Sequence, residues 1–278
     1  MVMSNKRVLT FQDISCVGQC SLTVALPVIS ACGVETVILP SAVLSNHTAF
    51  ESFTFRDLTD DIPDIVNKWK ELKEEFDCLY TGYLGSVKQM EYVKEIKREC
   101  IKQGGLLIVD PAMADNGYLY KGFDDAFITG MAKLCGEADI ILPNITEAAF
   151  LTKNEVILNH HTPEYINSLL NSLSKLGARK IILKGIEFEE GKIGVAIYDV
   201  ISDELKFYFT LKMPKGSHGT GDCYASTFTG ALMNGFSVYD AAALAADFVV
   251  ECIKNTTNDH WYGVSFEKAL PMLINRIN

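Results

Sequence analysis

Short hydrophobic runs alternate along this chain with longer segments in which apolar residues recur at helical spacing. The short runs have the length of buried strands, and several are rich in β-branched residues; they cover residues 7–11, 34–39, 78–80, 106–109, 140–142 and 180–183. The longer segments predict helices, with Gly104 and Gly177 placed to close two of them; they cover residues 62–76, 87–103, 124–135 and 163–176. Strands that alternate with helices are typical of a mainly parallel sheet.

The last third of the chain has a different pattern. Residues 193–198 and 205–211 alternate apolar and polar positions around an acidic turn, which predicts an antiparallel pair of strands. Residues 222–234, 238–254 and 266–277 have a helical pattern. The sequence has no repeat, low-complexity tract or linker, so we expect residues 1–278 to form a single α/β domain.

Composition narrows the classes of function. The chain carries 35 acidic and 25 basic residues, a formal charge of -10, and it has no run of lysine and arginine, so nucleic acid is not an expected partner. No apolar stretch approaches the roughly 18 to 20 residues of a membrane span, and residues 1–7 lack the apolar region of a signal peptide. We therefore expect a cytoplasmic protein that does not associate with membranes. The eight cysteines contain no Cys-x-x-Cys pair, and buried thiols are expected rather than zinc ligands or disulfides.

Polar residues follow most of the predicted strands. In open parallel sheets, ligands bind beyond the carboxyl ends of the strands, so these positions are candidates for chemistry. They hold Gln12, Asp13, Ser45, Asn46, His47, Thr48, Gly82, Tyr83, Asp110, Asp115, Asn144, Glu147 and Lys184.

The most informative segment spans residues 214–226. It begins as a glycine-rich loop and runs directly into the predicted helix of small residues that starts at residue 222. Gly219 and Gly221 allow the backbone to approach an anion closely, and the helix start supplies N–H groups at the positive end of its dipole. Asp222 lies at the same helix start, which favours the ionised form that a general base requires. This arrangement suits phosphoryl transfer, and the alternative is that Asp222 only caps the helix. Neither a P-loop nor a dinucleotide-binding glycine motif occurs.

Several motifs resemble those of one superfamily. The sequence from Gly219 to Asp222 resembles the anion-hole and catalytic-base signature of ribokinase-like kinases, and residues 110–117 and 143–147 are similar to two motifs of its vitamin-kinase branch. Residues 44–48 and 81–86 look like segments of pyridoxal kinases. The resemblance covers nearly the whole chain and implies a ribokinase-like three-layer α/β/α fold, in which helices flank a mainly parallel central sheet with an antiparallel edge.

The resemblance also implies roles for individual residues. Asp222 would deprotonate the 5′-hydroxyl of pyridoxal, pyridoxamine or pyridoxine, while the amides of Gly219, Thr220 and Gly221 hold the phosphoryl group that ATP donates. The residues implied for the vitamer, besides Asp222, are Asp13, His47, Thr48 and Tyr83. Those implied for the nucleotide are Asp110, Asp115, Asn144, Glu147, Lys184 and Lys215, with Asp110 and Glu147 near Mg²⁺. A monovalent cation and a homodimer are further expectations.

Plainer interpretations stay open for some of these residues. Asn144 followed by Glu147 is also the pattern of a helix capping pair. Tyr83 could be a partly buried aromatic residue, and Lys184 and Lys215 could be ordinary surface lysines.

The chain departs from the pyridoxal kinase pattern at Asp13, where many of these enzymes carry serine. A carboxylate there would attract a protonated ring nitrogen or an aminomethyl group, so we hypothesise a preference for pyridoxamine. The rival enzyme is a hydroxymethylpyrimidine kinase of thiamine metabolism, which shares the fold and phosphate site but commonly has cysteine where this chain has Asp222. A different class of answer is a non-catalytic relative that binds the vitamer, which the fold alone does not exclude.

Overall fold

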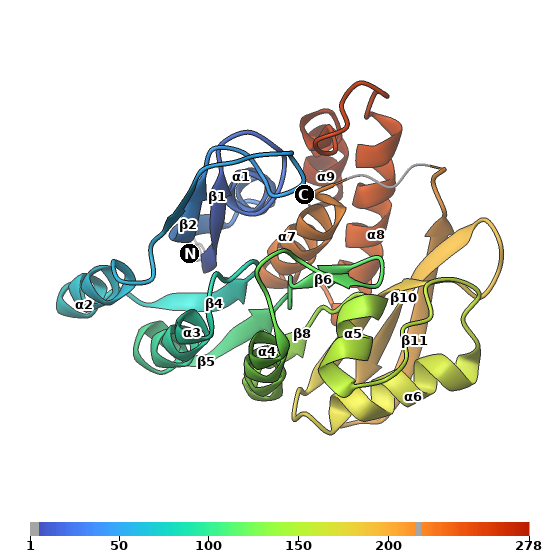
Figure 1. Ribbon diagram of the computed structural model, residues 1–278, viewed down its shortest axis with the longest axis horizontal. Helices are drawn as coiled ribbons and strands as arrows, with labels where there is room; N and C mark the ends of the chain where they lie inside the picture. The colour runs from blue at the N-terminus through green and yellow to red at the C-terminus, as the bar shows by residue number, and fades with distance from the viewer. Residues whose placement is uncertain (1–5, 215–217, 278) are drawn as a thin grey trace. The chain divides into compact units, whose positions relative to one another are not determined.

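The computed structural model describes residues 6–214 and 218–277, and the chain divides into two compact units (Figure 1). One unit comprises Met1–Leu106 and Met213–Asn278, and the other comprises Leu107–Lys212. That the whole chain is one domain stays a prediction. Lys215 lies outside the described residues, and its role in nucleotide binding also stays a prediction. No helix in the described part of the chain combines the length and hydropathy that a membrane span requires.

The sheet of the first unit is built around its first strand. This strand pairs in parallel with one neighbour on each side, and the order of the strands is β4-β1-β2-β3. The short last strand runs antiparallel to β2. The pairing register of β1 and β2 shifts between Gln12 and Ile14, which places Asp13 at an irregularity of the kind that redirects side chains beside functional sites. The strands are β1 (Arg7–Ser15), β2 (Glu35–Leu44), β3 (Phe55–Asp57) and β4 (Phe76–Thr81).

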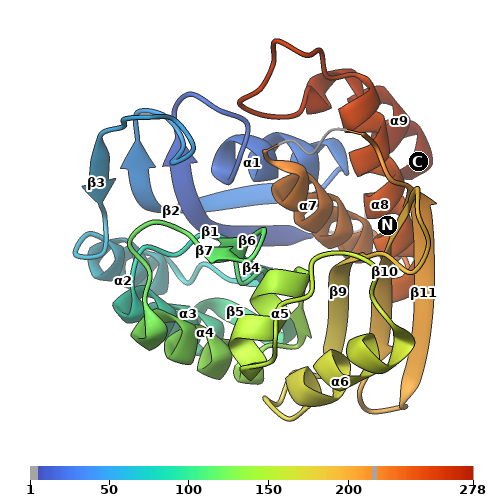
Figure 2. The ribbon, with the colours of Figure 1, turned by 45° about the vertical axis from the view of Figure 1, so that its right-hand side comes forward.

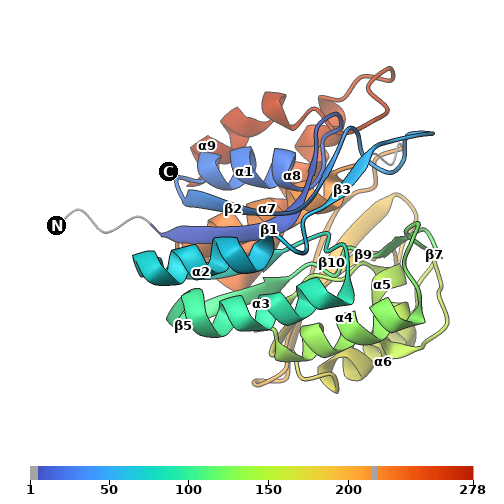
Figure 3. The same ribbon diagram turned by 60° about the vertical axis from the view of Figure 1, so that its left-hand side comes forward.

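Helices cover this sheet, and one of them is almost entirely buried. Helix α7 is buried at every residue from Cys223 to Ala231, because it packs against both α1 and α8. Small residues permit the close approach: a Cβ on Gly230 would lie 2.6 Å from the Cys32 sulfur. Helices α2 and α3 pack side by side (Figure 3). The helices are α1 (Leu22–Ala31), α2 (Ile62–Leu72), α3 (Val87–Cys100), α7 (Thr220–Met233), α8 (Val238–Lys254), the 3₁₀ helix η1 (Phe266–Lys268) and α9 (Leu270–Ile277).

The second unit has a mixed sheet with the strand order β11-β10-β9-β8-β5. Figure 2 shows β9, β10 and β11 side by side. The end of β5 pairs in parallel with β8, and β8 pairs in parallel with β9. The last two strands are antiparallel and form the edge. A separate hairpin is made by β6 and β7. The strands are the end of β5 (Ile101–Val109, of which residues 107–109 belong to this unit), β6 (Ala114–Asp115), β7 (Tyr118–Leu119), β8 (Ile140–Ile141), β9 (Lys180–Ile186), β10 (Lys192–Asp199) and β11 (Glu204–Leu211).

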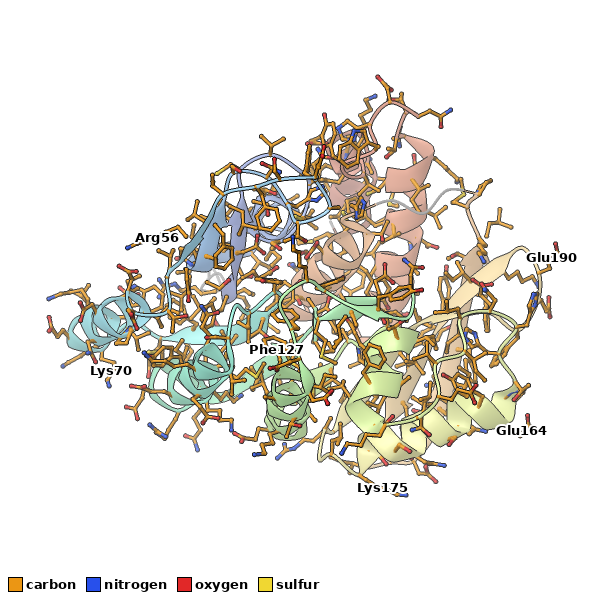
Figure 4. The ribbon with its side chains drawn as sticks, in the orientation of Figure 1. Arg56, Lys70, Phe127, Glu164, Lys175 and Glu190 are labelled. Carbon is orange, nitrogen blue, oxygen red and sulfur yellow. The ribbon has the colours of Figure 1, made fainter. Side chains whose placement is uncertain are left out.

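Three helices belong to the second unit, and each begins with a side-chain cap. The Asp124, Asn144 and Thr162 side chains accept hydrogen bonds from the backbone amides three residues later, which satisfies N–H groups that have no partner within the helix. Phe127, labelled in Figure 4, lies in the first of these helices. Its ring stacks on that of Phe123 at a centroid distance of 3.7 Å. The helices are α4 (Asp125–Glu137), α5 (Ile145–Thr152) and α6 (Pro163–Ser174).

The predicted fold class is confirmed: the protein is α/β, its sheet strands are mainly parallel, and an antiparallel pair forms an edge. The ends of two helices were predicted wrongly. Helix α2 ends at Leu72 instead of residue 76, because Lys73 takes a left-handed conformation and β4 begins at Phe76. Helix α3 ends at Cys100 instead of residue 103, because β5 begins directly at Ile101. Gly104 therefore closes no helix and lies within a strand at φ 78°. Helix α5 was not predicted.

Candidate active site

The start of helix α7 is shaped by one glycine. Gly219 is the residue before the helix, with φ 79°, and a Cβ at this position would lie 1.9 Å from the carbonyl oxygen of Gln19. The left-handed backbone and the lack of space both require glycine here. The amide of Cys223 donates to the Gly219 carbonyl at 2.9 Å, so the amides of residues 220–222 precede the hydrogen-bond ladder of the helix. They lie at the positive end of the dipole, where an anion is stabilised.

Asp222 lies in the first turn of α7 and is half-buried. The residue that precedes the helix is Gly219, so the alternative that Asp222 serves as the helix cap is wrong. Gly221, next to it, is exposed, and a Cβ there would meet nothing within 4 Å. A carboxylate and the first backbone amides of the helix therefore stand together at one helix start.

A second carboxylate, Asp13, acts on the same neighbour as Asp222. Burial raises the pKa of the Cys20 thiol, and the charges of Asp222 and Asp13 raise it further. Asp13 itself is only 4% exposed, and burial raises its pKa, whereas hydrogen bonds from Ser21 and Ser15 lower it. The Ser15 hydroxyl donates to Asp13 Oδ2 at 2.8 Å. The charges of both carboxylates therefore act on the Cys20 thiol.

Tyr83 lies within electrostatic reach of Asp13. Burial raises the pKa of the Tyr83 phenol to about 12, and the charges of Asp13 and Asp57 contribute in the same direction. Tyr83 therefore remains a neutral hydroxyl at physiological pH, and its ring is half-buried. Such a residue offers both a stacking surface and a hydrogen bond to an aromatic ligand.

Both ring nitrogens of His47 contact backbone groups of the protein. Its Nε2 is 2.8 Å from the carbonyl oxygen of Tyr262, and its Nδ1 accepts the amide of Ala49 at 3.2 Å. These partners require a neutral ring protonated at Nε2. In agreement, burial lowers the pKa of His47. The adjacent Thr48 is exposed. His47 thus holds the segment that carries Thr48 in position.

The second unit contains a buried ion pair. Lys184 Nζ is 3.0 Å from both carboxylate oxygens of Asp110, and their side chains are 13% and 7% exposed. Asp110 directly follows β5. Lys184 lies within β9, and its backbone forms an isolated parallel β-bridge with Asn144. The sequence left open whether Lys184 is a surface lysine, and its burial against Asp110 excludes that interpretation.

Asn144 and Glu147 form a complete capping box at the start of α5. The Asn144 side chain accepts the Glu147 amide at 2.9 Å, and Glu147 Oε2 accepts the Asn144 amide at 2.8 Å. The other Glu147 oxygen accepts the amide of Met113 at 3.3 Å, and Asn144 Nδ2 donates to the carbonyl of Ala114 at 2.9 Å. The capping interpretation of this pair is therefore correct, and the pair also fixes the loop that follows Asp110.

Three ionisable side chains, Asp110, Glu147 and Lys184, interact electrostatically next to this loop. Burial raises the pKa of Glu147 well above its usual range, the charge of Asp110 raises it further, and Lys184 opposes both effects. Asp115, in contrast, is exposed and accepts hydrogen bonds from the backbone and side chain of Asn116. Of the predicted nucleotide-binding residues in this unit, Asp110, Lys184, Asn144 and Glu147 form one connected cluster, and Asp115 lies on the hairpin tied to it through Ala114.

These residues fit magnesium in one particular way. Within the described ranges, no group of three or more histidine, cysteine, aspartate or glutamate side chains is arranged to hold a metal. Magnesium bound with nucleotides usually takes only one or two protein carboxylates, together with phosphates and water. The Asp110 carboxylate suits such a role. Both Glu147 oxygens already accept amides, so Glu147 fits a contact through water.

Sequence reasoning missed several residues around Asp13 and Gly219. Ser15 is two residues from Asp13 on the same strand, so the alternation of side chains along β1 indicated that the two share a face. Ser21 gave no such signal, because its contact with Asp13 depends on an unusual backbone conformation with φ 52°. Gln19 was also missed, since it acts through its backbone carbonyl.

Comparison with known proteins assigns the chain to a class of small-molecule kinases. The chain matches the phosphomethylpyrimidine kinase family over residues 27–263 and belongs to it. A Bacteroides thetaiotaomicron protein, provisionally assigned as a phosphomethylpyrimidine kinase and crystallised with pyridoxal, is 34% identical with a TM-score of 0.91, over 97% of this chain and 96% of that one.

Pyridoxal kinases are also similar along nearly the whole chain. The structure of the Lactobacillus plantarum pyridoxal kinase has a TM-score of 0.88 and 28% identity, and the match covers 98% of each chain. The pyridoxal kinase of Dictyostelium discoideum is 25% identical over 269 residues, which cover 91% of this chain and 86% of that protein. The predicted ribokinase-like fold is thereby confirmed, and the protein is a kinase of the pyridoxal and phosphomethylpyrimidine kinase group.

Proposed function

We propose that this protein transfers a phosphoryl group from ATP to the 5′-hydroxymethyl group of a vitamin B6 compound (pyridoxal, pyridoxamine or pyridoxine), as a step of vitamin B6 salvage. The observation that carries the proposal is the start of α7, where Asp222 lies in the first helical turn after Gly219, at the positive end of the helix dipole. Asp13 and Tyr83, in the same unit, are suited to the aromatic ring. The likeness to pyridoxal kinases over almost the full chain supports this substrate class.

In the first unit, Asp222 accepts the proton of the substrate hydroxyl as the hydroxyl oxygen attacks. A positioned general base of this kind typically contributes 10²- to 10⁴-fold to the rate. The amides of Gly219, Thr220 and Gly221 stabilise negative charge on the transferring phosphoryl group, at the positive end of α7. Tyr83, Asp13 and Thr48 bind the ring, and His47 binds it or positions Thr48.

In the second unit, the cluster around Asp110 serves the nucleotide. Lys184 neutralises phosphate charge, with Asp110 holding it in place. Asn144 and Glu147 fix the loop after β5, and Asp115 on its hairpin contacts the nucleotide. Magnesium, when bound with ATP, supplies further charge neutralisation, and Asp110 directly and Glu147 through water are the residues that would hold it. Lys215 and a monovalent cation complete the proposal without support from the described residues.

Hydroxymethylpyrimidine phosphorylation is the second candidate function, because the chain is also similar to a hydroxymethylpyrimidine/phosphomethylpyrimidine kinase of Bacillus subtilis, with 29% identity over 185 residues. Its substrate also presents a hydroxymethyl group on an aromatic ring, so the same base and amides would serve. A coupled ADP-release assay with ATP and magnesium separates the two, using pyridoxal, pyridoxamine, pyridoxine, hydroxymethylpyrimidine and ribose as acceptors. Turnover with the vitamers supports the first candidate, and turnover with hydroxymethylpyrimidine alone replaces it.

We further propose that the chain acts as a single-domain, cytoplasmic homodimer, as the resemblance to pyridoxal kinases implies. Light scattering on the purified protein tests the dimer, and a monomer mass contradicts it. Cell fractionation tests the location.

A further inference from the structure

Gln19, in the loop between β1 and α1, is approached by two glycine residues that are distant from it in the sequence. A Cβ on Gly219 would lie 1.9 Å from the Gln19 carbonyl oxygen. A Cβ on Gly263 would lie 2.6 Å from the Gln19 Cβ and 3.0 Å from its backbone nitrogen. The φ of Gly263 lies outside the left-handed region, so only the lack of space requires glycine there. Gln19 therefore packs directly against the backbone at the start of α7 and against the segment before η1.

The side-chain amide of Gln19 is oriented by one hydrogen bond. Its Nε2 donates to Glu267 Oε1 at 2.5 Å, and a bond to an ionised acceptor is stronger than a bond between neutral groups. Its Oε1 is buried and accepts no hydrogen bond from residues 6–214 or 218–277. Because an unpaired buried acceptor is unfavourable, the bond to Glu267 decides which way the amide points.

The segment 263–267 gives Gln19 a firm support. Val264 and Phe266 are 0% and 4% exposed, and η1 packs against both α8 and α9. The amide of Ser265 donates to Thr256 Oγ1 at 2.8 Å, which fixes the backbone between these two buried side chains. A segment anchored in this way restricts the movement of the residue that packs on it.

The position of Gln19 is transmitted to α7 through the backbone. Gly219 directly precedes the helix, and the amides of residues 220–222 follow it without an intervening residue. A shift of the Gln19 carbonyl therefore moves these amides or leaves a gap behind Gly219. The charge of Glu267 also raises the pKa of the Cys223 thiol, next to Asp222, which agrees with a place for Glu267 near the start of the helix.

We propose that Glu267 and Gly263 are positioning residues for phosphoryl transfer, which act through Gln19 to hold the first amides of α7 in the geometry that stabilises the transferring phosphoryl group. This inference rests on the proposed function, since it assigns further residues to the same anion site. It differs from a purely structural role in one consequence. Misplaced amides lower kcat, whereas the KM of the phosphoryl acceptor stays unchanged.

Glu267→Ala and Gln19→Ala each remove the hydrogen bond between the two side chains. We expect each variant to lower kcat about 10-fold with an acceptor KM within about twofold of wild type, because a misplacement of about 1 Å can cost 10²-fold. The double variant should lose no more than either single variant, since the two side chains act as one unit. Glu267→Gln keeps an acceptor for Gln19 Nε2 and should retain the wild-type kcat. Equal losses in Glu267→Gln and Glu267→Ala contradict the role of this bond.

Gly263→Ala disturbs Gln19 without removing a polar group. The added Cβ pushes on Gln19 and should lower kcat about 10- to 100-fold. Gly105→Ala is the matched control: its φ is also outside the left-handed region, and its Cβ would also lie 2.6 Å from the nearest atom, Cγ2 of Ile101. Unfolding curves should show a loss of stability in both variants, and kcat should fall only in Gly263→Ala. An equal fall in kcat for the two glycine variants overturns the inference.

Two further comparisons separate this inference from the proposed function. Turnover is measured with whichever acceptor of the ADP-release assay is phosphorylated, so the inference survives if that acceptor is not a vitamin B6 compound. A kcat that is unchanged in Gly263→Ala and Glu267→Ala overturns the inference and leaves the reaction standing.

If no acceptor is phosphorylated, inorganic phosphate serves as the probe, and its binding is measured as the rise in melting temperature that it causes. Phosphate that stabilises wild type and Gly105→Ala but not Gly263→Ala supports the inference, and the proposed reaction alone then fails. Equal stabilisation of all three proteins overturns the inference. If wild type neither phosphorylates an acceptor nor binds phosphate, both are wrong.

Discussion

The carbonyl oxygen of Gln19 lies 1.9 Å from the point where a Cβ would stand on Gly219. This close approach ties the loop before α1 to the start of α7, where Asp222 and the first amides of the helix are found. Gln19 is tied down further, since its side-chain amide donates to Glu267 Oε1 at 2.5 Å and a Cβ on Gly263 would lie 2.6 Å from its own Cβ. The backbone at the start of α7, which is the proposed anion site, is therefore fixed by close packing around Gly219. Glycine is needed there both for its positive φ and for its lack of a side chain.

Gly219→Ala should consequently impair both folding and turnover. The left-handed backbone alone costs about 1 to 2 kcal/mol for a residue with a Cβ, and the contact with Gln19 adds to this. Displaced amides should lower turnover by about 10²- to 10³-fold, as expected for loss of a charge-stabilising donor. Denaturant unfolding and the ADP-release assay measure the two effects.

Gly221→Ala is the matched control for stability. A Cβ at this position meets nothing within 4 Å, and alanine is the better helix former, so the free energy of unfolding should stay constant or rise by up to about 1 kcal/mol. Equal destabilisation of the two variants contradicts the account of Gly219.

The Asp110–Lys184 pair allows stability and activity to be separated. Lys184→Met leaves a buried carboxylate without its cation, which should cost about 3 to 5 kcal/mol of stability and raise the KM for ATP. The double variant Asp110→Asn with Lys184→Met removes both charges and should recover much of the stability without recovering activity. If the double variant regains activity as well, the pair is structural and the proposed nucleotide role is wrong.

His47 predicts how stability depends on pH. Burial lowers the pKa of His47 in the folded protein, so the unfolded chain binds a proton more readily near its ordinary pKa of about 6.5. Stability should therefore decrease as the pH falls below about 6.5. Other groups titrate in the same range, so the measurement is the difference between wild type and His47→Gln in unfolding free energy at pH 5.5 and 7.5. A His47→Gln variant with the same pH dependence as wild type contradicts this role.

Local sequence pattern predicted those parts of the fold that depend on periodicity, including the strands around Asp13 and the buried helix that begins near Asp222. It failed where the signal depends on distant contacts. The apolar pattern of α3 continues past Cys100, and only the pairing of β5 decides that a strand begins at Ile101. Helix α5 is short and buried on nearly all sides, so it shows no amphipathic period that identifies a helix.

The candidate site shows the same division. Asp222, Gly219, Asp110 and Glu147 could be proposed from the sequence because their motifs are contiguous, and their roles stay predictions. The close approach of Gln19 to Gly219 could not be predicted, because Gln19 acts through its backbone carbonyl. The Asn144 capping box shows that one motif can serve the structure and the proposed chemistry together.

The base assignment of Asp222 is tested most directly by comparing turnover of wild type and Asp222→Ala in the ADP-release assay with ATP, magnesium and pyridoxamine. Asp222→Asn serves as the size-matched variant, and unfolding curves verify that both variants fold. The account predicts a loss of turnover of about 10²- to 10⁴-fold with little change in stability. Vitamer phosphorylation that persists within a few-fold of wild type in a folded Asp222→Ala protein would contradict it.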